Sequence, residues 1–258
     1  LRSRNNLLHF QVPFTNVDGK SLMNKMKLFR INHVVCNSKF TKGFIDKEFG
    51  VKSVVVYPPV DTESIKPRRK KKMILSVGRF SQLKQAKRQD VLVKVFKKMC
   101  DKGLKDWRLV LAGGSEVGAG EYVERLKKMA DGYPIEIVEG PKYQKLLEYY
   151  GKSKIFWSAS GYGVDEKKDP GGVEHFGISV VEAMAAKSVP VVFGAGGYKE
   201  IVSDGKDGLL WKNMRQLMKI TQRIIKDSKE LMQISERALS KSDDYSYANF
   251  ERRLEAIV

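Results

Sequence analysis

Two glutamates eight residues apart, Glu174 and Glu182, stand on either side of a glycine that opens an apolar, alanine-rich segment. A loop, a glycine and a helix start make an anion site, because the first N–H groups of a helix lack partners and the helix dipole is positive there. We expect the amides of Phe176, Gly177 and Ile178 to hold a diphosphate at this point. A carboxylate inside an apolar helix is costly without a partner. Taken alone, such a pair more often belongs to a capped core helix with one exposed glutamate.

The residue types in this stretch suggest particular roles around a phosphorylated ligand. An acidic residue such as Glu182 can accept hydrogen bonds from a ribose diol, as one does in dinucleotide-binding folds. Glu174 lies on the loop side and could face a reacting sugar. His175 is either a contact for the ligand or a packed loop histidine, and the sequence leaves both interpretations open.

A second candidate group follows an apolar run that ends at residue 77. Gly78 would let a ligand approach the backbone, and Arg79 offers a planar fork for phosphate oxygens. Lys84 and Lys87 come next, near the start of an expected helix, and either could reach the same anion as a point charge. For at least one of these lysines, a solvated helix start is the better explanation.

Apolar runs and amphipathic segments alternate regularly after residue 72, which predicts an α/β fold with a Rossmann-like parallel sheet and helices on both faces. Ligands of such sheets bind at the carboxyl ends of the strands, where this chain concentrates its glycines. A dinucleotide-binding dehydrogenase would share the pattern, but no G-x-G-x-x-G follows the first strand. The predicted strands are 73–77, 108–112, 135–138, 154–158, 189–193 and 208–211, and the predicted helices include 86–102, 121–130, 142–150, 198–202, 214–239 and 247–257.

The double proline at 58–59 and the basic run at 67–72 are typical of a linker between domains. We therefore expect a domain boundary near residues 58–70. It would separate residues 1–58 from a larger α/β unit at 59–240, which a C-terminal helix at 241–258 follows.

Composition limits the class of partner. The chain has 258 residues and a net charge of +18, which favours nucleic acid, an anionic membrane surface or acidic substrates. No nucleic-acid-binding motif accompanies the charge, so we expect no nucleic acid partner. Cys36 and Cys100 lie far apart without metal or redox spacing, which favours a reducing compartment. We expect a cytoplasmic protein, either free or peripheral on the cytoplasmic face of a membrane, since no run of about 18 apolar residues occurs.

Several segments together resemble the nucleotide-sugar-binding domain of family 4 retaining glycosyltransferases, which have the GT-B architecture. Residues 37–41 and 57–61 resemble the end of the first domain and the crossing into the second, so the resemblance covers about residues 33–258. The segments of the second domain that carry it are Ser76-Val77-Gly78-Arg79, Leu109 to Gly114, Glu174-His175-Phe176-Gly177-Ile178, Glu182-Ala183-Met184-Ala185, Val189-Pro190-Val191-Val192, Gly196-Gly197, Asp204-Gly205 and Gly208-Leu209-Leu210-Trp211.

The resemblance implies transfer of a sugar from a UDP- or GDP-linked donor to a glycan or lipid-linked acceptor, with retained configuration. Arg79 and a lysine would neutralise the donor diphosphate, Glu182 would bind the ribose, and Glu174 would hold the sugar. The nucleotide base would lie near Gly140 and Pro141. The resemblance implies no metal and no cofactor besides the donor. It also implies that residues 1–58 are the end of a larger, acceptor-side domain, that 59–240 form the nucleotide-sugar-binding domain, and that the final helix at 241–258 crosses back to the first domain.

Two features depart from the family pattern. In the family, a lysine lies five or six residues after the arginine, and this spacing favours Lys84. Alignment on the apolar helix residues at 91–92 instead places the family lysine at Lys87. We favour Lys87 as the catalytic lysine beside Arg79 and Glu174. The first domain is also much shorter than usual, and His9 is a weaker candidate for a histidine near the donor sugar. A non-catalytic nucleotide-sugar-binding module, or a fragment lacking the acceptor domain, is therefore the alternative, and transfer or donor hydrolysis would exclude it.

Overall fold

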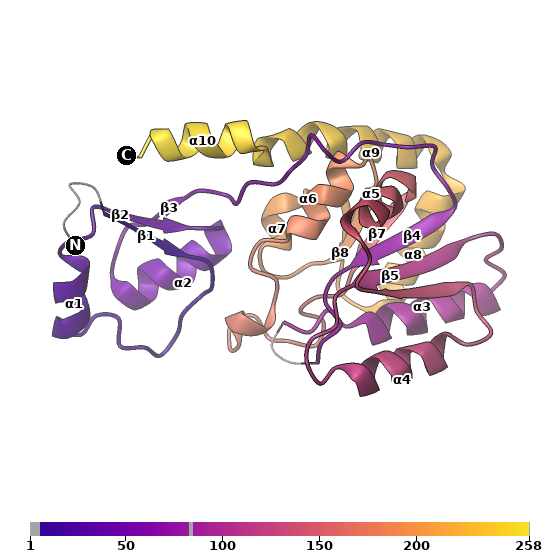
Figure 1. Cartoon of the computed structure of the whole chain (residues 1–258), viewed down its shortest axis with the longest axis horizontal. Coiled ribbons are helices and arrows are strands. Elements are labelled where there is room, and N and C mark those ends of the chain that lie inside the picture. The colour runs from indigo at the N-terminus through magenta and orange to yellow at the C-terminus, as the bar shows by residue number, and fades with distance from the viewer. Residues whose placement is uncertain (1–5, 83–84, 258) are drawn as a thin grey trace.

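The computed structural model describes residues 6–82 and 85–257, which form two parallel sheets joined by an extended connection (Figure 1). The first sheet has the order β1-β2-β3, with β1 at Leu7–Phe10, β2 at His33–Cys36 and β3 at Val54–Val55. Helix α1 (Leu22–Leu28) connects β1 to β2, and α2 (Lys39–Phe49) connects β2 to β3. Among the described residues, no helix is both long and apolar enough to span a bilayer.

The second sheet has the strand order β6-β5-β4-β7-β8-β9 with every neighbouring pair parallel. Counted from β4, this is the order 3-2-1-4-5-6 of the dinucleotide-binding fold, whose ligands bind beyond the carboxyl ends of the strands at the point where the order reverses. That point lies between β4 and β7. The strands are β4 (Met73–Val77), β5 (Arg108–Gly113), β6 (Ile135–Glu139), β7 (Ile155–Ser158), β8 (Val189–Phe193) and β9 (Leu209–Trp211).

Helices cover both faces of this sheet, as the continuous apolar runs predict (Figure 1). Successive side chains of a strand point to opposite faces, so Ile74 packs with α3, α4 and α8, whereas Leu75 packs with α5, α6 and α7. The predicted α/β class with a parallel sheet is confirmed. The helices are α3 (Gln89–Asp101), α4 (Gly120–Ala130), α5 (Tyr143–Lys152), α6 (Ile178–Ala185), α7 (Tyr198–Ile201), α8 (Met214–Lys226), α9 (Ser228–Ser242) and α10 (Tyr247–Glu255).

Two predicted helices differ most from those observed. The single helix predicted for 214–239 is divided at Asp227, whose extended backbone ends α8 and whose carboxylate accepts a hydrogen bond from the Glu230 amide at 2.9 Å. Aspartate followed three residues later by glutamate is a capping arrangement, and it starts a new helix here. Helix α3 begins at Gln89 and not at Ala86, because Arg88 has left-handed φ of 52°. The turn before α3, and not the helix itself, therefore carries Lys87.

Gly113, at the end of β5, lies against the turn that follows β4. A Cβ atom at Gly113 would be 2.1 Å from the Gly78 carbonyl oxygen, whereas one at Gly114 would meet nothing within 4 Å. Because the obstructing atom belongs to the backbone, we expect Gly113→Ala to lower the free energy of unfolding by about 3 kcal/mol, near the upper end for overpacking. Gly114→Ala is the matched control and should leave it nearly unchanged. Urea denaturation of both variants would measure the difference, and equal midpoints would contradict this account of the turn.

Candidate functional site

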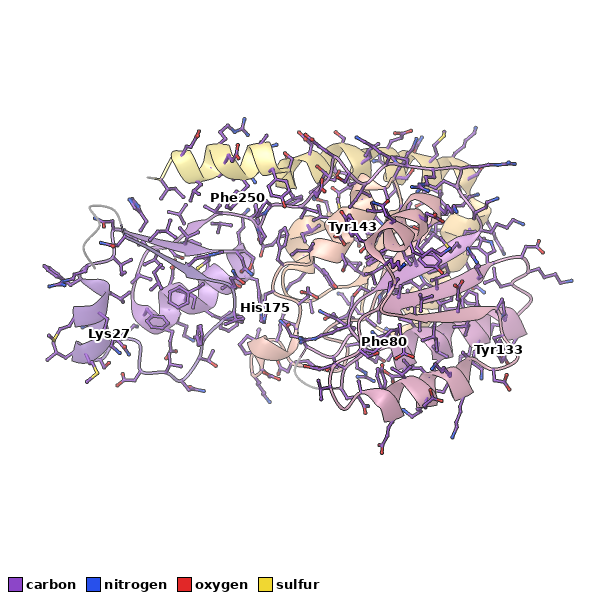
Figure 2. All side chains as sticks on the ribbon, viewed as in Figure 1. Lys27, Phe80, Tyr133, Tyr143, His175 and Phe250 are labelled. Carbon is purple, nitrogen blue, oxygen red and sulfur yellow. The ribbon has the colours of Figure 1, made fainter. Side chains whose placement is uncertain are left out.

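A cavity of about 820 Å³ begins at the carboxyl end of β4, on the side of the sheet where the strand order reverses. Residues of the first sheet and of the connection line its other side, and Figure 2 shows His175 between the two sheets, with Phe250 of α10 above it. The lining residues are His9, Gln11, Val12, Asn37, Pro58, Pro59, Val77, Gly78, Gln85, Lys87, Glu174, His175, Phe176, Gly177, Ile178, Ser179, Glu182 and Phe250. The cavity thus joins most of the residues that the sequence singled out.

Helix α6 opens directly onto this cavity. Its N-cap is Gly177, with φ of +117°, and no side chain of the described residues caps it. Gly177, Ile178 and Ser179 all line the cavity. A Cβ at position 177 would lie 2.6 Å from a ring carbon of Tyr198, so glycine is required both for the turn and for packing. The first N–H groups of a helix have no intrahelical acceptors. The arrangement therefore offers backbone donors and a positive dipole end to an anion.

An ion pair stands beside the start of α6. The Nζ atom of Lys87 lies 2.7 Å from Oε2 of Glu174, and the two side chains keep only 20% and 16% of their exposure. Burial alone would raise the pKa of Glu174, but the Lys87 ammonium and the hydroxyl of Tyr198, which donates to Oε2 at 3.4 Å, hold that pKa below its ordinary value. Glu174 is therefore a carboxylate, able to accept hydrogen bonds but not to supply a proton near neutral pH.

The turn after β8 holds the Glu174 backbone in place. The Gly197 amide donates to the Glu174 carbonyl oxygen at 2.8 Å, and a Cβ at Gly196, where φ is +56°, would lie 2.1 Å from that same oxygen. Only glycine allows the two loops to approach this closely. The Gly196-Gly197 pair noted in the sequence thus positions the loop that carries Glu174.

Glu182 lies further along α6 and has the opposite electrostatic environment. Its Oε2 accepts a hydrogen bond from the hydroxyl of Tyr150 at 2.6 Å. Burial raises the pKa of Glu182, the Tyr150 hydroxyl opposes that rise, and the charge of Asp61 adds to it. Two carboxyl groups of one cavity are thus shifted in opposite directions, a pattern that is frequent where side chains have distinct functions.

His175 is both packed and part of the cavity wall. Its ring is 6% exposed, stacks on Phe40 with centroids 6.4 Å apart, and has Nδ1 2.9 Å from Nε2 of Gln85. Burial lowers the pKa of His175, which keeps the imidazole neutral at physiological pH. Phe176 is likewise buried, and its ring stacks on Tyr57 at 5.7 Å. A ligand can therefore contact Phe176 through its backbone and not through its ring.

The remaining predicted site residues fall into different places. Gly78 lines the cavity, whereas Arg79 is exposed and lines an adjoining hollow of about 410 Å³ that shares Gln85 and His175 with it. Gly140 and Pro141 lie outside the residues that line either space. Lys84 lies outside the described residues, so its position stays a prediction. His9, from β1, lines the cavity from the opposite side.

The sequence did not identify the side chains that contact the predicted glutamates and histidine. Tyr198 and Tyr150 donate to the two glutamates, and Gln85 contacts His175. The tyrosines come from α7 and the end of α5, and their sequence neighbours carry no motif. Only the packing of α5, α6 and α7 on one face of the sheet brings these hydroxyls to the carboxylates.

Glu200 of α7 connects the second sheet to the first. Its carboxylate accepts hydrogen bonds from the amides of Lys39 and Phe40, at 2.8 and 2.6 Å, and so caps the first turn of α2. We expect Glu200→Ala to lower the free energy of unfolding of the first sheet and its helices by about 1–2 kcal/mol, the usual loss for a cap. Small-angle scattering should also give a larger radius of gyration. Glu121→Ala, in the first turn of α4, is the control, and an unchanged radius in both variants would contradict the connecting role of Glu200.

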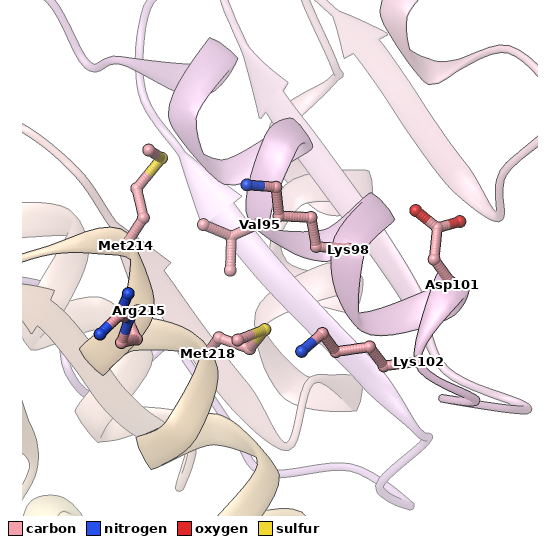
Figure 3. A pocket seen from close by; sticks show the side chains of 7 residues that line it. All are labelled: Val95, Lys98, Asp101, Lys102, Met214, Arg215 and Met218. Atoms are coloured by element: carbon pink, nitrogen blue, oxygen red, sulfur yellow. The ribbon is translucent and has the colours of Figure 1, made fainter.

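A second hollow, of about 480 Å³, lies between α3 and α8, and none of its lining residues belongs to a strand (Figure 3). It has an apolar floor and basic side chains, and it contains none of the predicted site residues. Because ligands of this sheet type bind at carboxyl ends of strands, this hollow is not the candidate site. Its lining consists of Val95, Lys98, Asp101, Lys102, Met214, Arg215 and Met218.

Comparison with known proteins agrees with the fold. Residues 60–241 match the family described as Glycosyl transferases group 1. A curated relative, the GDP-Man:Man(3)GlcNAc(2)-PP-Dol alpha-1,2-mannosyltransferase of Dictyostelium discoideum, is 28% identical over 220 residues, which are 80% of this chain and 42% of that protein. The chain thus spans less than half the length of this relative.

Solved structures with the GT-B fold superpose on nearly the whole chain. Anabaena HepE in complex with UDP and glucose has a TM-score of 0.77 at 17% identity, covering 98% of this chain and 71% of that chain. A glycosyltransferase from Rickettsia africae has a TM-score of 0.77 at 19% identity, covering 97% of this chain and 69% of that one. At such identities the likeness establishes the fold. Because the family match covers most of the chain, from residue 60 to residue 241, the chain belongs to the Glycosyl transferases group 1 family.

Proposed function

We propose that this chain is part of a retaining glycosyltransferase of family 4, which transfers a sugar from a nucleotide-diphosphate sugar to a glycan. The observation that carries the proposal is the Lys87–Glu174 ion pair beside the uncapped start of α6, with Glu182 further along the same helix and in the same cavity. This set combines donors for a diphosphate with acceptors for the hydroxyls of a sugar and a ribose.

Charge development in the reaction explains why these groups are needed. When the bond between the sugar and the diphosphate breaks, negative charge grows on the diphosphate oxygens. The amides of Gly177 and Ile178, the Lys87 ammonium and the Arg79 guanidinium would stabilise that charge. The lysine ammonium has three donors, of which Glu174 accepts one, so the others can serve phosphate. These groups supply positive charge without a metal ion, and we propose that the reaction requires none.

The two glutamates would bind opposite ends of the donor. Glu174, kept ionised by Lys87, would accept hydrogen bonds from hydroxyls of the transferred sugar. Glu182 would accept them from the ribose diol. The acceptor hydroxyl would attack the sugar on the face from which the diphosphate leaves, and a diphosphate oxygen would take its proton, so that configuration is retained. We propose that the base lies toward Gly140 and Pro141, and that His9 approaches the sugar from the first sheet.

The curated relative suggests the donor and the acceptor. Its name specifies GDP-mannose and a dolichyl-diphosphate-linked glycan, and we propose GDP-mannose and a lipid-linked glycan for this protein, with a UDP-sugar as the other donor class. We also propose that it acts in the cytoplasm, at a membrane surface, and that its parts divide near residues 58 and 240. In support of that division, the two sheets have no strand in common.

Calorimetric titration with GDP, UDP and ADP, each with and without magnesium, tests the donor site. We expect selective binding of GDP with the same dissociation constant in both conditions. Selective binding of UDP would assign a UDP-sugar as the donor and leave the assignment of the site unchanged. Absence of binding by all three nucleotides would contradict the proposal. Hydrolysis of the bound donor, followed by NMR of the first anomer released, tests retention. Nucleotide binding without any hydrolysis or transfer would favour the alternative, a non-catalytic binding module.

A further inference from the structure

Tyr143 places an exposed aromatic ring on the side of α5 that packs toward α6. It is the first residue of α5, two positions after Pro141, and it is 52% exposed. At 100° per residue, Leu147 and Tyr150 lie on the same stripe of the helix, and both are buried in the cluster that α6 completes (Figure 1). The stripe thus begins with an exposed ring and ends with the hydroxyl that donates to Glu182 at 2.6 Å.

The rise of α5 sets the separation of the two tyrosines. Seven residues advance an α-helix by about 10 Å, and α5 begins at the carboxyl ends of the strands, just after β6. Tyr143 therefore lies beyond Tyr150 in the direction in which the cavity opens. A nucleoside whose ribose is held by Glu182 spans a distance of this order, so its base would reach Tyr143.

Asp61 brings a carboxylate to the same place from the connection between the two sheets. Partial burial raises the pKa of Tyr143, and the negative charges of Asp61 and Glu182 raise it further. The charge of Asp61 also raises the pKa of Glu182. Because the charge of one side chain shifts the pKa of another mainly at short range, these three side chains lie close together, although they come from three separate segments.

Asp61 is held in place by the turn that follows it. Its Oδ1 accepts a hydrogen bond from the Ser64 amide at 3.0 Å. Hydrogen bonds from the hydroxyl and the amide of Ser64 hold the pKa of Asp61 below its ordinary value, so it is a carboxylate at neutral pH. A carboxylate has about four lone-pair sites and no donor. Asp61 can therefore accept further hydrogen bonds, whereas it repels a ligand atom that is itself an acceptor.

We propose that Tyr143 and Asp61 form a site for guanine, in which the ring of Tyr143 stacks on the base and the Asp61 carboxylate accepts hydrogen bonds from its N1–H and N2–H groups. The inference rests on the proposed function, because Glu182 has to hold the ribose for the base to reach these residues. Aromatic rings and hydrogen bonds to the Watson–Crick edge are the usual means of recognising an unpaired base.

The bases differ in what they present to a carboxylate. Guanine has two neighbouring donors on its Watson–Crick edge. Adenine has the acceptor N1 beside its amino group, and uracil has one N–H between two carbonyl oxygens. A carboxylate cannot donate to these acceptors and is repelled by them. Asp61 therefore favours a GDP-linked donor over an ADP- or UDP-linked one.

Variants of Tyr143 test the stacked ring. We expect Tyr143→Leu to weaken GDP binding by about 10–100-fold, within the range that stacking of a base on an aromatic ring contributes. Tyr143→Phe is the matched control, because it keeps the ring and removes only the hydroxyl, and it should bind GDP as the unmodified chain does. Calorimetry would measure both dissociation constants. Equal binding of GDP by Tyr143→Leu and Tyr143→Phe would overturn the role of the ring.

Replacing Asp61 by asparagine tests how the base is selected. Asparagine can still accept from the Ser64 amide, as it does in other turns and caps, but its amide presents a donor beside an acceptor, which is the complement of adenine. We expect Asp61→Asn to lower the preference for GDP over ADP by at least about tenfold, since hydrogen bonds to a charged group are lost. Glu63→Gln removes the same charge from an exposed neighbour and should keep the preference.

Inosine diphosphate identifies the atoms involved, because its base lacks the N2 amino group. It should bind the unmodified chain more weakly than GDP does, and the difference should nearly disappear in Asp61→Asn. The same ratio of the two dissociation constants in both proteins would show that Asp61 does not contact the amino group, and would overturn the proposed selection.

A fluorescent variant locates the base. The native tryptophans are buried, at 6%, 0% and 0% exposure for Trp107, Trp157 and Trp211. Emission of Tyr143→Trp should be quenched when GDP binds, because guanine would stack on the new indole. Emission of Val117→Trp, at another exposed position, should not change.

The outcomes for this inference and for the proposed function are distinguishable. GDP binding that neither Tyr143→Leu nor Asp61→Asn alters would overturn the guanine site and leave the donor cavity in place. Selective binding of UDP by the unmodified chain would also overturn the guanine site alone. Absence of binding by GDP, UDP and ADP would overturn both.

Discussion

Replacing Lys87 by methionine should reduce donor hydrolysis or sugar transfer by about 10²–10³-fold, the usual consequence of removing one preorganised group that stabilises transition-state charge. Methionine keeps most of the volume of the side chain but removes the ammonium that lies 2.7 Å from Glu174. Because the diphosphate gains charge only as the bond breaks, we expect the loss mainly in kcat. Steady-state measurement with GDP-mannose, compared with the exposed control Lys127→Met, would test the expectation.

The same substitution should also destabilise the protein. Removing one partner of a buried ion pair lowers the free energy of unfolding by about 3–5 kcal/mol. Because this pair keeps some exposure, we expect a loss at the lower end, about 3 kcal/mol. In the unmodified chain the pKa of Glu174 is lowered, so its stabilising contribution is full above the unfolded pKa of about 4.3 and is lost as pH falls through the lower, folded pKa. Without Lys87, burial would raise that pKa, and the variant should instead gain stability as pH falls from 7 toward 5.

A double variant separates the two roles of Lys87. Lys87→Met/Glu174→Gln contains no buried unpaired charge, so we expect it to recover most of the stability in urea denaturation but none of the activity. Recovery of activity along with stability would assign Lys87 a structural role only. Unchanged activity in Lys87→Met itself would contradict the catalytic assignment directly.

Replacing Glu182 by alanine should weaken nucleotide binding by about 10–100-fold, because hydrogen bonds to a charged group contribute about 1.5–3 kcal/mol. The raised pKa of Glu182 adds a pH dependence. Binding should weaken as pH falls through that pKa in the unmodified chain, because the protonated carboxyl loses one acceptor, and this dependence should disappear in Glu182→Ala. Calorimetry with GDP at several pH values would measure both effects. Glu124→Ala, an exposed glutamate of α4, is the control.

A nucleotide without the ribose 2′-hydroxyl tests whether Glu182 binds the diol of the ribose. We expect 2′-deoxy-GDP to bind the unmodified chain more weakly than GDP does, and the two nucleotides to bind Glu182→Ala nearly equally. Comparing the two nucleotides in the two proteins is equivalent to a double-mutant cycle, and it isolates the interaction between the Glu182 carboxylate and the 2′-hydroxyl. A constant ratio between the two nucleotides in both proteins would show that Glu182 acts elsewhere.

The sequence predicted the second sheet better than the helices around it. Its strands are buried on both faces, so 73–77 and 189–193 are almost entirely apolar, with Ser76 as the one polar residue. The ends of helices depend on smaller effects. Asp227 divides one long amphipathic pattern through a single capping bond, and the left-handed backbone of Arg88 delays α3 by three residues. Neither effect changes the apolar periodicity on which the prediction relied.

The residues alone indicated the candidate site where a motif is local, and the resemblance added Lys87, which lies 2.7 Å from Glu174. Gly177 and the helix that follows it form a recognisable anion site, because the loop, the glycine and the helix start are contiguous. The hydroxyl of Tyr150 meets Glu182 across 32 residues, and Glu200 reaches the Phe40 amide across 160. Such contacts follow from strand order and crossover geometry, which one sequence does not encode in any local pattern.

Hydrogen exchange in the presence of a nucleotide tests the central claim most directly. If the cavity beside the Lys87–Glu174 pair binds the donor diphosphate, saturating GDP should slow amide exchange at residues 174–180 and in the turn at 76–88, and should leave α8 unchanged. Protection confined to α3 and α8, the walls of the hollow in Figure 3, would contradict the assignment of the donor site to the start of α6.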